Sequence, residues 1–538
     1  DACVDLVVDG GNAPSRIART YKPRRRVASG GEQQHDMTLA TTSASLGATT
    51  ADAAMPGIPG DEATSAIVLC DAALAKLARM CQRGSLLLPV ANQPIIQFIL
   101  DTLARSGIRK VTFAGTDQVS CDALSMYLAS GASGASSSVS KNVSVDVVCD
   151  PSCGKSSVKL IRRVLASDAQ HDLSVALDGR EGKKSHGSHE DVLVVGSLFV
   201  PVSSPSSPSP SSTDADLSLQ GQLLYHKVKK AAVTMLMVPA VADDNGEYST
   251  REYVAVRADG VVAAYCPAGT SKSSDVRVPV VALLPQQGES VETGDRLTVR
   301  KDVSDVRVCV FNREALSHVL QEDESDGLVD VQKHLIPYFV RRMAVQSAKS
   351  ALNAKHGGSG SVPRALERMS SSTLSMSGGE TERGGESDGD GNGSKRLAVH
   401  AYVRSAASLM VVDSEASYAN VNREILRYLE RSEIAKNVKL GAKAAVNTSI
   451  VACNSSLGDR SSVKRSVMGP NCSIGASAKI VNSILHEGVT VGDGCQVHNS
   501  ILCRGVTLVA KTSLKDCVVG PNCSVPGGNH KGEEFFDE

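Results

Sequence analysis

The sequence predicts an α/β protein, in which a domain built on a parallel β-sheet is followed by a C-terminal parallel β-helix. Two observations support this prediction. Short apolar runs alternate with segments of helical spacing from Ser65 to Val345, and the C-terminal part of the chain repeats itself every 17 residues. The chain of 538 residues is long enough for roughly two to four domains, and its 41% hydrophobic content allows sizeable cores.

The sheet domain begins at Ser65, where strands start to alternate with helices, as in a parallel sheet covered on both faces. The order of apolar runs and helical spacings then predicts the elements one by one. Buried strands are expected at 66–70, 110–114, 143–149, 191–200 and 233–238, and helices at 71–83, 94–106, 122–129, 157–165 and 219–230. A strand-rich part follows at 253–257, 261–264 and 306–311, then helices at 314–320 and 331–345. A strand near Arg396 and a helix at 418–431 lead into the repeats.

Three apolar columns and one column of small residues recur at the 17-residue period. A period this short has no room for a pair of helices, so each repeat must be one coil of short strands stacked on the next. We interpret the apolar columns, spaced 4, 7 and 6 residues apart, as three inward-facing sides, and the small column as the tight corners. The columns are Val446, Val463, Ile480, Val497 and Leu514; Ile450, Val467, Ile484, Ile501 and Val518; Leu457, Ile474, Val491, Leu508 and Val525; and Ser449, Ser466, Ser483, Ser500 and Cys517. Cys472 and Cys523 lie three periods apart and should share a further column as small buried side chains.

Composition shifts set the expected domain boundaries. Residues 1–64 are predicted to be a disordered extension, and 65–345 the sheet domain, with low-complexity inserts near 131–140, 178–190 and 203–216. A disordered insert is expected at 346–395, a connecting segment at 396–435, the β-helix at 436–525 and an acidic tail at 526–538.

Charge, hydropathy and cysteine usage exclude several classes of protein. The net charge of −1 and the pI near 6.9 give no global electrostatic reason to expect nucleic acid as a partner. We expect no membrane span, because no window approaches 18 uninterrupted apolar residues, and no signal-peptide core precedes a cleavage site. The 14 Cys are scattered singly, apart from Cys149 and Cys153, which have no further Cys or His at the spacing of zinc ligands. These features predict an intracellular, cytoplasmic protein.

The segment Ser85 to Ile95, SLLLPVANQPI, resembles the signature of the sugar-nucleotide pyrophosphorylase superfamily. The domain order of that superfamily is also similar: a Rossmann-like nucleotidyltransferase-type sheet domain and then a β-helix. The resemblance implies that the β-helix of this chain is left-handed.

The same resemblance shows which phosphate-binding groups an active member of the superfamily would need, and most of these groups are missing here. The superfamily has a Gly-rich turn with an Arg after the first strand, where backbone N–H groups approach the nucleotide phosphates. Here Asp71 to Met80 contains no glycine, and Ser85 stands where the family has a phosphate-binding Lys. The family's Gly-Thr-Ala element would fall on Gly154, Lys155 and Ser156, which keeps only the glycine.

The metal site of the superfamily is also incomplete. Its metal-binding Asp should fall near Ser197, and Asp305 is at most the second acidic position. One carboxylate is too few to gather two phosphates around Mg²⁺. We therefore expect no catalytic, cofactor-binding or metal-binding residues, no cofactor and no enzymatic activity.

Two other chemistries have weaker signals. Cys149 to Ser156, CDPSCGKS, lies between a strand and a helix as a P-loop would, but the leading glycine is absent, and an ordinary turn with a helix-capping Ser is expected. Acyl transfer on a β-helix usually needs a His as general base. His486 and His498 are available, but both lie in polar stretches between strands, where a solvated loop His is expected.

Further segments resemble the γ and ε subunits of eukaryotic translation initiation factor 2B. Gln332 to Met343 is similar to the helix that closes their catalytic-type domain, and Ala416 to Ile425 to the segment before their β-helix. His226 to Val238, followed by Glu252 to Val256, fits the same pattern. The ε subunit continues into a helical-repeat domain that catalyses nucleotide exchange, whereas this chain stops at Glu538, which makes it more similar to γ.

The resemblance implies a non-catalytic subunit of the exchange factor for translation initiation factor 2. Such a subunit pairs with ε to promote GDP release, contacts factor 2, and joins the β, δ and α subunits in a larger hetero-oligomer. The alternative is a divergent sugar-phosphate nucleotidyltransferase, similar to mannose-1-phosphate guanylyltransferase, or its regulatory paralogue.

Overall fold

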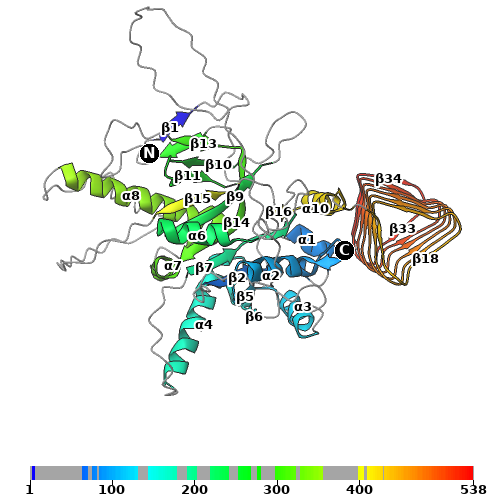
Figure 1. The fold of residues 1–538 in the computed structure, drawn as a ribbon, viewed down its shortest axis with the longest axis horizontal. Helices are drawn as coiled ribbons and strands as arrows, with labels where there is room; N and C mark the ends of the chain where they lie inside the picture. The colour runs from blue at the N-terminus through cyan, green and yellow to red at the C-terminus, as the bar shows by residue number, and fades with distance from the viewer. Residues whose placement is uncertain are drawn as a thin grey trace, which may run out of the picture.

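The computed structural model places a mixed β-sheet domain beside a C-terminal solenoid (Figure 1). The predicted extension at 1–64 lies almost wholly outside the described residues, as do the inserts near 131–140, 178–190 and 203–216. Within that extension only β1 (Cys3–Leu6) and Thr64 are described, and β1 pairs with β12 (Val276–Pro279). The described residues are 3–6, 64–70, 75–81, 84–130, 143–177, 191–202, 218–240, 252–267, 276–279, 297–322, 327–355, 398–404, 409–427, 429 and 431–536.

Seven strands form the main sheet in the order β15-β9-β14-β7-β2-β5-β6. They are β2 (Ser65–Leu69), β5 (Lys110–Gly115), β6 (Ser144–Cys149), β7 (Asp191–Val195), β9 (Val233–Pro239), β14 (Val303–Asn312) and β15 (Val399–Val403). The sheet was predicted to be parallel, but β14 is antiparallel to both β7 and β9. The reason is the connection from β9 to β14, which runs through a small antiparallel sheet, β11 (Val262–Cys266), β10 (Tyr253–Val256) and β13 (Thr298–Arg300), and through no crossover helix in its described part.

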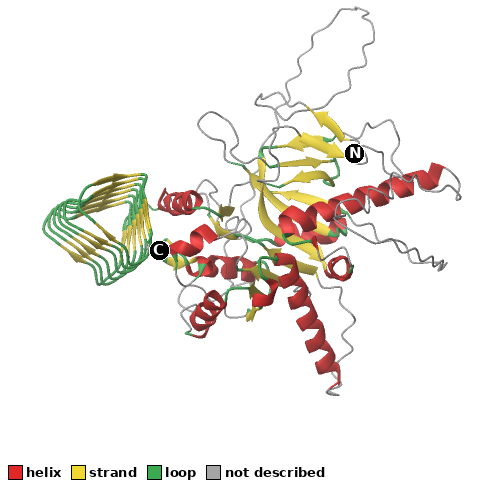
Figure 2. Cartoon of the chain, turned by 180° about the vertical axis from the view of Figure 1, so that it is seen from behind, coloured by secondary structure: helices red, strands yellow, loops and turns green. Residues whose placement is uncertain are grey.

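Helices cover both faces of this sheet (Figure 2). In β7, Leu193 and Val195 pack into one core and Val192 and Val194 into the other, so the strand is an apolar run without polar alternation. One core receives α2 (Ile95–Arg105), α3 (Gln118–Ala129), α6 (Gln220–Lys229) and α10 (Glu415–Arg427); the other receives α4 (Ser157–Leu177), α7 (Arg313–Gln321) and α8 (Ile336–Lys355). None of the described helices is long and apolar enough to cross a membrane.

Several predicted elements differ in their bounds; α4, for example, was expected to end at 165 and runs to Leu177. The strand expected at 191–200 is broken at Gly196 and Ser197 into β7 and β8 (Leu198–Pro201), and β8 leaves the main sheet to pair with β16 (Leu409–Val412). The helix expected at 71–83 is described only as α1 (Ala75–Met80). The closing helix starts with one π-turn, Val331–Leu335, and α8 then runs to Lys355, into the segment 346–395 that was predicted to be disordered. The remainder of that segment, from 356, lies outside the described residues.

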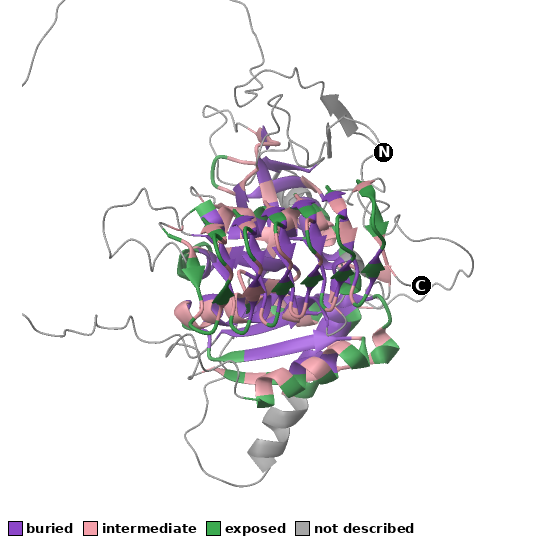
Figure 3. Ribbon diagram, turned by 90° about the vertical axis from the view of Figure 1, so that its right-hand side faces the viewer, coloured by how far each residue is buried: buried purple, intermediate pink, exposed green. Residues whose placement is uncertain are grey.

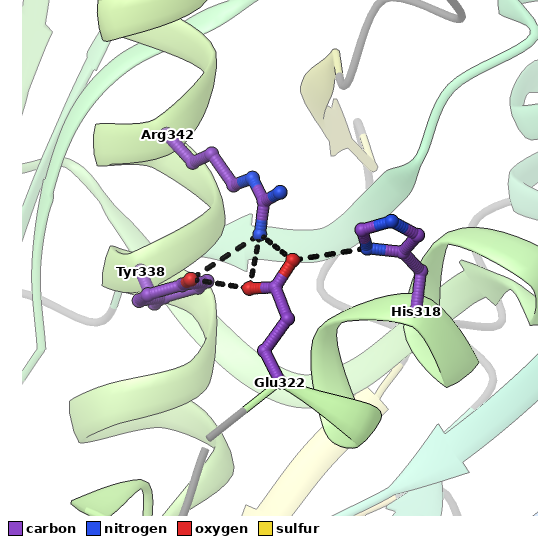
Figure 4. A network of polar contacts seen from close by, with 4 residues as sticks. All are labelled: His318, Glu322, Tyr338 and Arg342. Atoms are coloured by element: carbon purple, nitrogen blue, oxygen red, sulfur yellow. Dashed lines mark hydrogen bonds and ion pairs between the residues drawn. The ribbon is translucent and has the colours of Figure 1, made fainter. Parts of the chain in front are cut away.

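A polar network holds α7 against α8 (Figure 4). Glu322, at the end of α7, accepts hydrogen bonds from Arg342 and from the Tyr338 hydroxyl, 2.8 Å away, and its Oε1 lies 3.0 Å from Nδ1 of His318. Burial disfavours the charged form of Glu322, yet these hydrogen bonds outweigh it and lower its pKa. The network joins the helix after β14 to the helix that closes the domain.

The solenoid consists of stacked coils, and equivalent strands pair in parallel, one period apart (Figures 1 and 3). The first side contains β17 (Glu433–Ile434), β20 (Ile450–Val451), β23 (Val467–Met468), β26 (Ile484–Leu485), β29 (Ile501–Leu502), β32 (Val518–Val519) and β35 (Glu534–Phe535). The second contains β18 (Lys439–Leu440), β21 (Ser456–Leu457), β24 (Ser473–Ile474), β27 (Thr490–Val491), β30 (Thr507–Leu508) and β33 (Ser524–Val525). The third contains β19 (Ala445–Asn447), β22 (Ser462–Lys464), β25 (Lys479–Val481), β28 (Gln496–His498), β31 (Ser513–Lys515) and β34 (Asn529–Lys531).

The predicted register of the coils is confirmed, because each of the three apolar columns pairs with itself through the stack. Cys472 and Cys523 are both buried in the solenoid interior, as expected for a shared column. The predicted end at 525 is too early. β34 and β35 add a further coil, so most of the expected acidic tail is part of the solenoid.

One apolar column faces outward, contrary to the prediction. Ile450, Val467, Ile484 and Ile501 pack with the sheet domain, whereas their neighbours Val451, Met468, Leu485 and Leu502 fill the solenoid interior. The inward positions are therefore spaced 5, 6 and 6 residues apart, as Val446, Val451, Leu457 and Val463 show. This side of the solenoid is buried on both faces.

A ladder of serine hydroxyls follows one edge of each coil. Ser483 Oγ donates to the carbonyl of Val481 at 2.8 Å and accepts the backbone N–H of Ser500 at 3.2 Å. The same pair of bonds recurs at Ser449, Ser466 and Ser500. Each serine directly follows a corner residue with positive φ, such as Asn482 at 54°. The small column was expected at the corners because of its size, and the hydroxyl adds a hydrogen-bonding reason.

We predict that Ser483→Ala lowers the free energy of unfolding of the solenoid by about 1–3 kcal/mol, because it leaves the buried N–H of Ser500 without a partner. Ser483→Cys is the matched control, since Cys517 already occupies this column. Thermal unfolding followed by circular dichroism measures both variants. Equal midpoints for Ser483→Ala and the parent would contradict the proposed role of the ladder.

Candidate functional site

Helix α1 and Ser85 lie at the positions where the sequence resemblance would place the binding of nucleotide phosphates, and residues 71–74 of this turn lie outside the described residues. Leu77 and Met80 of α1 are fully buried in the sheet-domain core. Ser85 is 5% exposed, and its hydroxyl donates to the carbonyl of Cys70, 3.4 Å away, at the end of β2. The described chain therefore has a buried helix here, and a small side chain whose hydroxyl is bonded within the protein. Phosphate binding would instead need open backbone N–H groups and a cation.

The fold brings together Ser197 and Asp305, the two positions compared with the metal-binding carboxylates of the superfamily, where no metal site was expected. Gly196 and Ser197 lie against β14: the N–H of Gly196 donates to the carbonyl of Arg307 at 2.8 Å, and Ser197 Oγ donates to the carbonyl of Val306, next to Asp305. Ser197 is 3% exposed, so its hydroxyl is used inside the protein. Among the described residues, no three His, Cys, Asp or Glu side chains gather as a metal site would require.

Asp305 is buried beside a second carboxylate that the sequence did not single out. Tyr265 donates its hydroxyl to Asp305 Oδ2 at 2.8 Å, and the N–H of Arg307 donates to Oδ1 at 2.7 Å. Glu252 Oε2 accepts the backbone N–H of Asp305 at 3.2 Å and the hydroxyl of Ser304 at 2.9 Å. Burial, and then the charge of Glu252, raise the pKa of Asp305 to about 7. This carboxylate is bonded into the domain core.

The segment Cys149 to Ser156 forms a turn that bonds to itself. Asp150 accepts the N–H of Ser152 at 3.0 Å, and Ser156 Oγ accepts the N–H of Lys159, 3.2 Å away, in the first turn of α4. The prediction of a helix-capping Ser is confirmed.

The outward column of the solenoid forms an apolar contact with α10. Ile484 and Ile501, each 5% exposed, face Ala419 and Leu426 across a narrow groove. These side chains belong to the same continuous core as the α2 side of the main sheet. Polar residues border the groove, where Arg423 donates to Asn499 Oδ1 at 3.1 Å.

Tyr418 joins three parts of the chain at the centre of this contact. Its hydroxyl donates to the carbonyl of Pro89 in the sheet domain and lies 2.9 Å from Nε2 of His486 in the solenoid. Because the single hydroxyl hydrogen is directed to Pro89, we assign the neutral tautomer of His486 that donates from Nε2. Burial lowers the pKa of His486 to about 4, which keeps the imidazole neutral.

The hairpin formed by β3 (Pro89–Val90) and β4 (Gln93–Pro94) fixes the position of α10 and the solenoid. Its turn residues Ala91 and Asn92 both have positive φ, 48° and 65°, as in a type I′ turn. The N–H of Ala91 donates to Asn422 Oδ1 at 2.9 Å, and Asn92 Nδ2 donates to the carbonyl of Met468 at 3.0 Å. Part of the segment that resembles the superfamily signature is therefore used here to bind the solenoid.

The placement of His486 corrects a prediction. It was expected to be solvated but is 5% exposed, whereas His498 ends β28 and stays partly exposed. A signal for this burial is present in the sequence. The positions one period apart from His486 are small, Ala452, Gly469, Cys503 and Gly520, and a column of small residues allows a neighbouring element to approach closely.

We predict that Ile484→Asp loosens the contact between solenoid and sheet domain, at a cost of about 3 kcal/mol or more, because it buries an unpaired carboxylate. Hydrogen exchange should accelerate at the amide of Ala91, while the amides of β31 stay protected. Val509→Asp is the control, since Val509 is 49% exposed on the same solenoid. Equal acceleration at Ala91 in both variants would contradict the role of Ile484 in holding the solenoid against the sheet domain.

The stability of this contact should depend on pH through His486. Its pKa is about 4 in the folded chain and 6.5 when exposed, so unfolding takes up a proton between these values. The contribution of His486 to stability therefore falls as the pH decreases from 6.5 to 4, by on the order of 3 kcal/mol. Asp305, whose pKa is raised, contributes in the opposite direction in both proteins, so urea unfolding should compare the two: the free energy of unfolding of the parent should fall relative to that of His486→Gln over this range. His498→Gln, at the partly exposed position, should behave as the parent does.

Residues 429–530 match a family model described as the EIF2B subunit epsilon LbH domain. A search of curated proteins finds no match. The matched residues cover nearly all the stacked coils, which are therefore a left-handed β-helix, while the sheet domain lies outside the match. The chain thus combines an α/β sheet domain with a C-terminal left-handed β-helix of the eIF2B-related type.

Proposed function

We propose that this chain is a non-catalytic, γ-type subunit of an eIF2B guanine-nucleotide exchange factor. In this proposal it pairs with an ε subunit in the cytoplasm and promotes GDP release from translation initiation factor 2, and so translation initiation. The single observation that supports the relation to eIF2B is the match of residues 429–530 to the β-helix of its ε subunit, and the γ-type part of the proposal rests on the sequence resemblance. The β, δ and α subunits are further proposed partners.

The proposal of a non-catalytic role is supported by the sheet domain. Where a nucleotidyltransferase needs phosphate and metal ligands, Ser85 and Ser197 donate to backbone carbonyls, and α1 buries Leu77. A scaffold function requires no open site at these positions. We therefore assign no catalytic residue and no cofactor to this chain.

The arrangement of the solenoid supports a partner-binding role. One of its three sides is covered by α10 and the β3-β4 hairpin. Most outward residues of the other two sides are polar, and many are exposed, as at Thr490, Gln496 and Thr507. These sides are available to other subunits.

We expect the purified chain alone to leave the rate of GDP release from factor 2 unchanged. Together with an ε subunit it should raise the rate above that of ε alone by roughly fivefold or more, the lower end of typical coupling between sites. Release of labelled GDP from factor 2 measures both, and co-purification with tagged ε tests the pairing.

Two outcomes would contradict the proposal. Acceleration of GDP release by the chain alone would indicate an ε-type catalytic subunit. Clear turnover in a pyrophosphate-release assay with nucleoside triphosphates and sugar phosphates would indicate a nucleotidyltransferase. Ile484→Asp, measured beside Val509→Asp, would show whether the effect on ε depends on the docked solenoid.

A further inference from the structure

The first coil of the solenoid, residues 431–447, is an open end. Its strands β17, β18 and β19 each lie at the edge of their sheet and pair with only one described strand, that of the second coil. Ile434 is 42% exposed and Leu440 is 50% exposed, whereas their equivalents in the second coil, Val451 and Leu457, are buried. Inward-facing side chains of the solenoid are thus presented to solvent, next to strand edges.

The opposite end is closed by the chain itself. His530 and Phe535 occupy inward columns of the last coil and pack edge to face, with ring centroids 5.2 Å apart. Phe536 lies under the guanidinium of Arg79 from α1, 4.7 Å from its ring centroid, and Glu534 forms an ion pair with the same Arg79 at 3.8 Å. Between the two described ends of the stack, it is therefore the first coil that leaves aliphatic inward residues uncovered.

The open end is also strongly basic. Four basic residues and one acidic residue, all exposed, give the first coil a net charge of +3 in a chain whose net charge is −1. They are Arg431, Lys436, Lys439, Lys443 and Glu433. Two copies of this end facing each other would bring like charges together, which disfavours a symmetric dimer through the first coil.

We propose that the open first coil binds an acidic, strand-forming segment of a partner protein. The segment would add to the edges of β17 to β19 as a further coil does, cover Ile434 and Leu440, and place carboxylates beside the lysines. Backbone hydrogen bonds and apolar burial would provide affinity, and the charge would select the partner. This inference goes beyond the proposed function and does not depend on it.

Two peptides with the sequences of single coils of this solenoid can serve as matched probes of the open first coil. A peptide of residues 482–498 carries Glu487 and Asp493, for a net charge of −2, whereas residues 499–515 carry Arg504, Lys511 and Lys515, for +3. Both begin with Asn-Ser-Ile-Leu and have the same register of inward side chains. Synthesised with capped, labelled termini and with Cys495→Ala or Cys503→Ala, they differ mainly in charge.

Fluorescence anisotropy of each peptide, titrated with the full chain, tests the proposal. We expect the acidic peptide to bind and the basic one to bind at least about tenfold more weakly. Leu440→Glu should weaken the binding of the acidic peptide by at least about tenfold, because it removes the apolar burial at residue 440 and adds a negative charge that repels the peptide. Val509→Glu, at a residue of similar exposure, 49% against 50%, should leave binding unchanged.

A charge-reversal variant keeps the test valid if Leu440→Glu disturbs the coil. Lys436→Glu combined with Lys439→Glu and Lys443→Glu should invert the preference, so that the basic peptide binds more tightly. The inference is overturned if the acidic peptide does not bind, if both peptides bind equally, or if Val509→Glu causes the same loss. No ε subunit or factor 2 is present in this assay, so its failure is distinct from failure of the proposed function.

Discussion

The rest of the structure depends on the contact between the outward apolar column of the solenoid and α10. Four aliphatic residues of this column, Ile450, Val467, Ile484 and Ile501, are buried against the sheet domain. Each buried aliphatic side chain contributes about 1.5–3 kcal/mol, whereas a neutral hydrogen bond contributes about 1 kcal/mol. The apolar column therefore provides most of the attraction, and the bonds of Tyr418 and Asn422 select one register.

This contact gives the β3-β4 hairpin, which belongs to the segment that resembles the superfamily signature, a structural role that does not require a nucleotide. The turn at Ala91 and Asn92 reaches both α10 and a backbone carbonyl of the solenoid. The hairpin is directly followed by α2, whose Ile95, Ile99 and Leu103 are fully buried in the core of the sheet domain. Movement of the solenoid would therefore act on the sheet domain through a short and well-packed connection.

The sequence predicts the stacking of the coils but leaves the direction of one column open. A period of 17 residues determines which residues lie above each other, since equivalent positions must pair. It does not determine which of two adjacent apolar residues faces inward, because both are buried on this side. The doublets Ile484-Leu485 and Ile501-Leu502 were the available signal, as the other two sides carry one apolar residue per strand at most positions.

Other features lack a local signal altogether. The antiparallel direction of β14 is set by how the chain returns from the small sheet, and an apolar run reads the same in both directions. The pairing of Glu252 with the backbone of Asp305 spans 53 residues and depends on the strand register there. Long-range polar contacts of this kind follow from the fold and could not be predicted from spacing.

The polar groups at the positions compared with the phosphate and metal ligands of the superfamily are all bonded locally. The hydroxyls of Ser85 and Ser197 donate to backbone carbonyls, and Asp305 accepts from Tyr265, so each polar group is bonded where burial would otherwise make it costly. A Lys introduced at Ser85 would bury an ammonium group at a 5% exposed position, beside α1 rather than a glycine turn. The single substitution Ser85→Lys would therefore destabilise the domain rather than create a phosphate site. The sheet domain bonds these polar groups internally, whereas the first coil of the solenoid leaves strand edges and inward apolar side chains exposed, which favours the binding of a partner there.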